Sequence, residues 1–111
     1  MSVFRVVMVR FIDGVSEEEV AGFRDWLETL AARTPGLLRM VCGANLPLGD
    51  EAVLASKAPA ATYGDFASIW EFDSTASLSA FVDDPDHHAM AGSQFKRVVA
   101  HRYVFNIGSR E

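Results

Sequence analysis

The segment FRVVMVRF, residues 4–11, is the stretch of sequence that decides the fold. Its β-branched and aromatic residues predict a β-strand, and side chains alternate between the two faces of a strand. A strand that is apolar on both faces has to be covered on both faces. The two alternating sets are Phe4, Val6 and Met8 on one face, and Val7, Val9 and Phe11 on the other.

Working outward from this strand, the sequence alternates between helical and extended segments. Ser16 and Glu19 form a capping box that predicts a helix start, and Thr34-Pro35-Gly36 predicts its end. The polar caps around Ser74 and Asp84 predict two further helices, the second running from residue 86 to about residue 97. The remaining expected strands are residues 37–44, 66–72 and 102–107, and residues 45–62 are expected to form a lid or a disordered loop.

This order of elements predicts a ferredoxin-like α+β fold, a four-stranded antiparallel sheet with its helices on one face. The 111 residues are expected to form a single domain over residues 1–111. Phe4, Val6 and Met8 then lie on the sheet face without helices. Because burial of each such side chain is worth about 1.5–3 kcal/mol, we expect a homodimer whose sheets pack face to face.

Composition narrows the class of protein further. Cys42 is the only cysteine, which excludes an internal disulfide framework or a multi-cysteine zinc site and is typical of the reducing cytoplasm. The net charge of −5 argues against a nucleic-acid or anionic membrane surface. No apolar run approaches the roughly 20 residues that span a bilayer. We therefore expect a cytoplasmic protein without a nucleic-acid or membrane partner.

Three segments carry a more specific pattern. Residues 3–19 combine the first strand with an aspartate–glycine turn and an acidic helix start, and Thr34-Pro35-Gly36-Leu37 stops that helix. The third segment runs from IWEFDS, residues 69–74, to DPDH, residues 84–87. With these segments in this order, the chain resembles the stress-responsive dimeric α/β-barrel (Dabb) family over almost its whole length.

The resemblance implies a homodimer in which two sheets close into a barrel, with an apolar pocket between the sheet and the helices of each subunit. It also implies a cofactor-independent, metal-free reaction of the polyketide cyclase type, since the best-understood enzymes of the family are polyketide cyclases such as plant olivetolic acid cyclase. Other members of the family are stress-related proteins without an assigned reaction. The expected ligand is a small apolar or aromatic carbonyl compound, such as a polyketide.

The same resemblance implies a set of site residues. His87 matches the family's proline-x-histidine and is expected to transfer a proton, because its ordinary pKa lies near neutrality. Arg5 takes the place of a first-strand histidine and would stabilise an oxyanion. Phe81 takes the place of the cyclase tyrosine, so Tyr103 is expected to supply the missing hydroxyl. The expected pocket lining is Phe23, Leu27, Met40, Phe66, Phe81, Met90, Val98 and His101.

Simpler interpretations stay open for these residues. Asp84, Asp86, His87 and His88 resemble a metal site, but a helix-capping acidic cluster is the better interpretation and no metal is expected. Asp65 would orient a histidine or form a turn.

The predicted function is that of a cyclase, lyase or isomerase. The alternatives are a non-catalytic ligand-binding or stress-related domain, and a cofactor-free monooxygenase of the antibiotic-biosynthesis type.

Overall fold

The computed structural model describes residues 2–46 and 64–108, and its elements follow the predicted order. From residue 47 on, the predicted loop lies outside the described residues. The last strand begins at Val99 rather than at Arg102. The strands are β1 (Val3–Phe11), β2 (Leu37–Ala44), β3 (Phe66–Phe72) and β4 (Val99–Ile107), and the helices are α1 (Glu17–Ala32), α3 (Thr75–Asp83) and α4 (Pro85–Val98).

Short polar side chains start each helix. The capping box before α1 is present, since the backbone N–H of Glu19 donates to Ser16 Oγ at 3.0 Å and the backbone N–H of Ser16 donates to Glu19 Oε1 at 3.2 Å. Ser74 caps α3, because its Oγ accepts a hydrogen bond from the backbone N–H of Ser77 at 3.1 Å. Asp84 ends α3 and caps α4, accepting a hydrogen bond from the backbone N–H of Asp86 at 3.0 Å. This shared cap fixes where α4 begins and hence where His87 lies.

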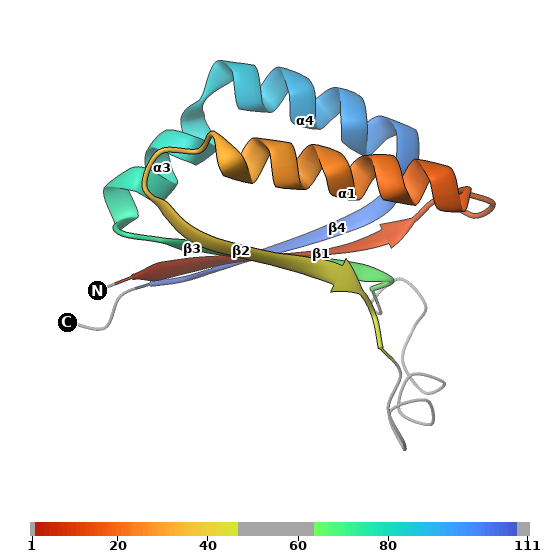
Figure 1. The fold of residues 1–111 in the computed structure, drawn as a ribbon, viewed down its shortest axis with the longest axis horizontal. Helices are drawn as coiled ribbons and strands as arrows, with labels where there is room; N and C mark the ends of the chain where they lie inside the picture. Colours follow the sequence, from red (N-terminus) through yellow and green to blue (C-terminus); the bar gives the residue numbers. More distant parts are fainter. Residues whose placement is uncertain (1, 47–63, 109–111) are drawn as a thin grey trace.

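The four strands form one sheet in the order β2-β3-β1-β4, and each neighbouring pair is antiparallel. All three helices lie on one side of this sheet (Figure 1). The predicted ferredoxin-like α+β architecture is thereby confirmed.

The core lies between the sheet and the helices. Alternate residues of β1 and β3 enter it, and α1 contributes positions that recur at helical spacing. The buried apolar side chains are Val3, Val9, Phe66, Trp70 and Phe72 from the sheet, and Phe23, Leu27, Leu30, Leu78, Phe81 and Val98 from the helices.

The opposite face of the sheet, here called the outer face, carries none of the described helices (Figure 1). Apolar side chains are exposed on it. One row of side chains crosses all four strands, because Val41 pairs with Ile69, Ile69 with Val6, and Val6 with Phe105. Three members of this row are well exposed: Val41 at 54%, Ile69 at 45% and Phe105 at 68%. The division of β1 into a covered face and an uncovered face follows the sequence prediction.

Across residues 2–46 and 64–108, no helix has both the length and the apolar character needed to cross a membrane.

Candidate functional site

A small cavity, here called the inner cavity, lies between the sheet and the helices and has a volume of about 40 Å³. A single water needs about 10–15 Å³, so the inner cavity has room for only a few waters or for one chemical group of a ligand. Six of the predicted site residues line it: Arg5, Phe23, Leu27, Phe66, Phe81 and His87.

Aromatic rings occupy most of the space that the sequence assigned to a pocket. The ring of Phe23 lies 5.8 Å from that of Phe66 and 5.6 Å from that of Phe95, both in edge-to-face arrangements. Trp26 meets Phe95 edge to face at 6.0 Å. This packing makes the inner cavity much smaller than the aromatic-sized pocket that we expected from the sequence.

His87 lies in the first turn of α4, directly behind the Asp84 cap, and is half-buried. Its Nδ1 is buried and has no hydrogen-bond partner among the described residues. Burial lowers the pKa of His87, and the positive charges of His88 and Arg5 lower it further, although Asp84 acts in the opposite direction. The imidazole is therefore neutral near pH 7 and has the protonation state of a general base.

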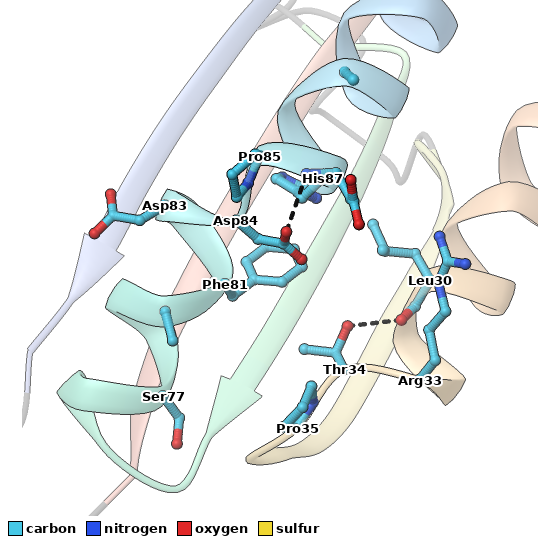
Figure 2. Close-up of a pocket in the computed structure, with 13 residues that line it drawn as sticks. Leu30, Arg33, Thr34, Pro35, Ser77, Phe81, Asp83, Asp84, Pro85 and His87 are labelled. Carbon is cyan, nitrogen blue, oxygen red and sulfur yellow. Dashed lines mark hydrogen bonds between the residues drawn. The ribbon is translucent and has the colours of Figure 1, made fainter.

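A larger, open groove of about 780 Å³ lies on the other side of His87, here called the outer groove. The end of α1, with Arg33 and Thr34, faces Asp84 and His87 at the start of α4 across the groove (Figure 2). Leu30, Phe81 and His87 line both the outer groove and the inner cavity. These three side chains are a partition between the two spaces, and His87 is the ionisable member of it.

Arg5 reaches the inner cavity from the middle of β1 and is half-buried. Its Nη1 donates a hydrogen bond to Asn106 Oδ1 at 3.1 Å. Burial lowers the pKa of Arg5, and the neighbouring charge of Arg102 lowers it further. A guanidinium keeps its charge through such a shift, so Arg5 presents a positive charge to the inner cavity.

The structure places Tyr103 and His101 away from this site. Tyr103 pairs with Met8 and His101 pairs with Arg10, and directly opposite residues of antiparallel strands share a face. Both side chains therefore belong to the outer face, and the expectation that they enter the pocket is wrong. His101 and Tyr103 do share a face, as the two-residue period of a strand requires, but it is the uncovered one.

Met40 and Val98 were also predicted to line the pocket, but neither lines the inner cavity. Met40 packs at the edge of the core from β2, and Val98 is buried in the core itself. Met90 belongs to α4, but its side chain lies outside what the structure describes.

Arg102 is the residue that the sequence analysis missed. It pairs with Val9, which faces the helices, so Arg102 lies on the same face as Arg5 and lines the inner cavity from the edge strand β4. Its guanidinium carbon lies 4.8 Å from the centre of the Phe95 ring. Arg102 shares this face with Val104, two residues along the strand, which also lines the inner cavity.

The other candidates have structural partners. Asp65 Oδ2 accepts the backbone N–H of Phe11 at 3.0 Å, so Asp65 stabilises the end of β1 and not a histidine. Cys42 is half-buried, and burial raises the pKa of its thiol. In the described part of the chain, no three side chains of His, Cys, Asp or Glu gather as a metal site.

Comparison with known proteins gives a family match and several structural matches. Residues 3–108 match the family model described as the stress responsive A/B barrel domain. A dimeric ferredoxin-like protein of unknown function from Thermobifida fusca is 26% identical, with a TM-score of 0.73 over 98% of this chain and 92% of that one. No protein of curated function matches the sequence.

Two enzymes share the fold at lower identity. The hydroxynitrile lyase of Passiflora edulis is 18% identical, with a TM-score of 0.75 over 99% of this chain and 94% of the lyase. SnoaB, a cofactor-independent oxygenase from Streptomyces nogalater, is 13% identical, with a TM-score of 0.67 over 99% of this chain and 94% of the oxygenase. At these identities the likeness shows the fold alone.

Proposed function

The chain belongs to the stress-responsive A/B barrel (Dabb) family, and from this premise we propose that it binds a small carbonyl compound on which His87 acts as a proton-transfer base. One observation carries the proposal. His87 is a neutral, half-buried imidazole with an unpartnered Nδ1 among the described residues, and it borders both the inner cavity and the outer groove.

The reaction class follows from the groups at hand. His87 accepts a proton from the carbon next to a carbonyl, the electrons of the C–H bond move into the C–C bond, and the carbonyl oxygen becomes negative. Arg5, whose charge faces the inner cavity, stabilises that oxygen. The proton then returns to carbon or to oxygen. This step is shared by aldol cyclases, lyases and isomerases, so the polyketide cyclase reaction remains one member of the proposed class.

Cavity sizes indicate how a ligand divides between the two spaces. The outer groove, at about 780 Å³, lies within the range of about 300–1,000 Å³ that is usual for small-molecule sites. The inner cavity, at about 40 Å³, accommodates only the reacting end. We place the body of the ligand in the outer groove and its carbonyl end at His87, which requires the side chains of the partition to move apart.

Support for small-molecule catalysis also comes from the fold. A hydroxynitrile lyase and a cofactor-independent oxygenase are built on the same architecture. No residue role passes from them to this chain at such low identity. The monooxygenase alternative differs in its activity, which would depend on oxygen and use a phenol as substrate.

A second candidate function rests on the filled interior. Because rings of Phe23, Phe66 and Phe95 leave only about 40 Å³, a non-catalytic ligand-binding or stress-related role fits the same structure. The two functions differ in turnover, since only the first needs the base.

The test uses phenylpyruvate, an aromatic carbonyl compound whose keto–enol conversion is followed by ultraviolet absorbance. We expect the wild-type protein to accelerate the conversion, His87→Gln to abolish the acceleration, and the exposed neighbour His88→Gln to retain it. Equal rates for the wild type and His87→Gln would refute the proposed base and favour the non-catalytic role.

We also propose that the partner of the outer face is a second copy of the chain. The row formed by Val41, Ile69, Val6 and Phe105 is apolar and largely exposed, and a face that packs on its own copy satisfies two-fold symmetry. The Thermobifida fusca protein of this fold is described as dimeric.

We also propose that the present chain is cytoplasmic, on the basis of its lone cysteine and its net negative charge.

A further inference from the structure

The inner cavity has an electrostatic character that the proposed base does not explain. Arg5 and Arg102 approach it from two adjacent strands, and no acidic side chain is among the described residues that line it. The two guanidiniums contact neutral groups: an amide oxygen of Asn106 for Arg5 and the ring of Phe95 for Arg102. Two cations therefore face one small space without a counter-charge in the described part of the chain.

Arg102 is exposed to solvent and Arg5 is half-buried, so the arrangement is unfavourable chiefly for Arg5. A charge that is removed from water needs a partner of opposite sign, and two like charges at one site raise the free energy further. Both effects act on Arg5, since its pKa is lowered by burial and by the charge of Arg102. The cost is explained if the cavity is built to receive a negative charge.

Neutral groups of the cavity point to the same chemistry. Trp26 lines it, and the buried indole N–H of Trp26 has no acceptor among the residues that the structure describes. Ser68, which is also buried in the lining, accepts the indole N–H of Trp70 at 2.8 Å and keeps its own hydroxyl proton to donate. The residues that line the cavity therefore include hydrogen-bond donors, which suit a group that accepts hydrogen bonds.

We propose that the inner cavity binds the carboxylate of an acidic ligand between Arg5 and Arg102. Two oxygens in one plane match the fork of a guanidinium, and a space of about 40 Å³ is suited to a group of this size. This inference rests on the proposed role of the inner cavity as the ligand site. It narrows the substrate class from carbonyl compounds in general to 2-oxo acids, in which the carboxylate adjoins the carbonyl, so that one reacting end brings both groups to Arg5.

The test measures binding alone, so that it is independent of turnover. Acetate and benzoate are titrated into the protein against acetamide and benzamide, which have nearly the same shape and no charge. The readout is the indole N–H signal of Trp26 in a nitrogen-15 NMR spectrum, identified by Trp26→Phe. We expect saturable binding of benzoate at least about tenfold tighter than that of benzamide, weakening as salt is added.

Single variants locate the charge. We expect Arg5→Gln and Arg102→Gln each to weaken benzoate binding at least about fivefold, because each removes one charge-assisted partner. Arg97→Gln removes the same charge from an exposed position on α4 and should leave the affinity within about twofold. The indole signal of Trp70 reports whether each variant is folded. If Arg5→Gln does not fold, benzoate binding is measured on Arg5→Lys instead, which keeps the charge.

The outcomes separate this inference from the proposed function. Equal binding of benzoate and benzamide, equal effects of Arg97→Gln and Arg102→Gln, or no saturable binding of either acid would overturn the carboxylate site. His87→Gln should bind benzoate like the wild type. Retained benzoate binding without phenylpyruvate conversion would leave the carboxylate site standing and refute the base.

Discussion

The imidazole of His87 lies against the phenyl ring of Phe81, with ring centres 4.2 Å apart and planes inclined by 45°. The contact joins the first turn of α4 to the last turns of α3 (Figure 2). It also connects His87 to the core, because Phe81 in turn packs on Trp70 and Phe72 at 5.3 Å each. The candidate base is therefore held by the same aromatic packing that stabilises the fold.

This burial makes a prediction about pH. The pKa of His87 is lowered in the folded protein, so the unfolded chain binds a proton more readily. The contribution of His87 to the free energy of unfolding is therefore complete above its pKa in the unfolded chain, about 6.5. It is lost as the pH falls through the lower pKa of the folded protein. Urea unfolding at pH 8 and pH 5 should show a larger loss of stability for the wild type than for His87→Gln. His88→Gln removes one of the charges that lower the pKa of His87, so its loss of stability should be smaller than that of the wild type. A pH dependence that survives unchanged in His87→Gln would contradict the assignment.

Removal of the Phe81 ring should weaken both the fold and the partition. Phe81 is 8% exposed, and truncation of a buried phenylalanine to alanine costs about 3–5 kcal/mol. We expect Phe81→Ala to lose that amount in denaturant unfolding, while Thr29→Ala on the exposed side of α1 stays within about 0.5 kcal/mol. Water then reaches His87, so its pKa, followed by NMR titration, should rise toward the ordinary value. An unchanged His87 titration would mean that Phe81 does not provide the burial.

How far the sequence could predict this site depends on the strand. On β1 the two-residue period places Arg5 on the same face as Val3 and Val9, the two buried residues of that strand. The edge strand β4 misleads, because its apolar set, with Tyr103 and Phe105, lies on the outer face while Arg102 faces the helices. A strand whose two faces are both covered, one by helices and one by a proposed second subunit, gives no polar face from which to orient it.

The packing of the aromatic rings could not be predicted from the sequence either. The sequence correctly indicates that Phe23 and Phe66 face the interior, but whether their rings wall a pocket or fill it depends on contacts between separate elements. His87 was found through a short motif next to a helix cap, and both are local in the sequence. Arg102 is close to His87 only in space.

Two glycines should respond in opposite directions to alanine. Gly36 has a φ of +79°, and a Cβ there would collide with the side chain of Ser77 on α3. Gly22 lies in α1, and a Cβ at this position would meet nothing within 4 Å. We expect Gly36→Ala to destabilise by more than about 1 kcal/mol and Gly22→Ala to stabilise by up to about 1 kcal/mol in urea unfolding. A neutral Gly36→Ala would show that the Gly36 turn is not required in this conformation.

The outer face supplies the last prediction, because Ile69 lies in the middle of its apolar row, between Val41 on β2 and Val6 on β1. In a two-fold dimer Ile69→Glu buries two carboxylates, one from each subunit, and each buried charge without a partner costs at least about 2 kcal/mol. We therefore expect the dimer to weaken about a thousandfold in analytical ultracentrifugation. Ile69 is 45% exposed in the single chain, so the monomer should keep its circular dichroism spectrum. Thr29→Glu adds the same charge on the helix side and should remain dimeric; a dimeric Ile69→Glu would exclude this face as the interface.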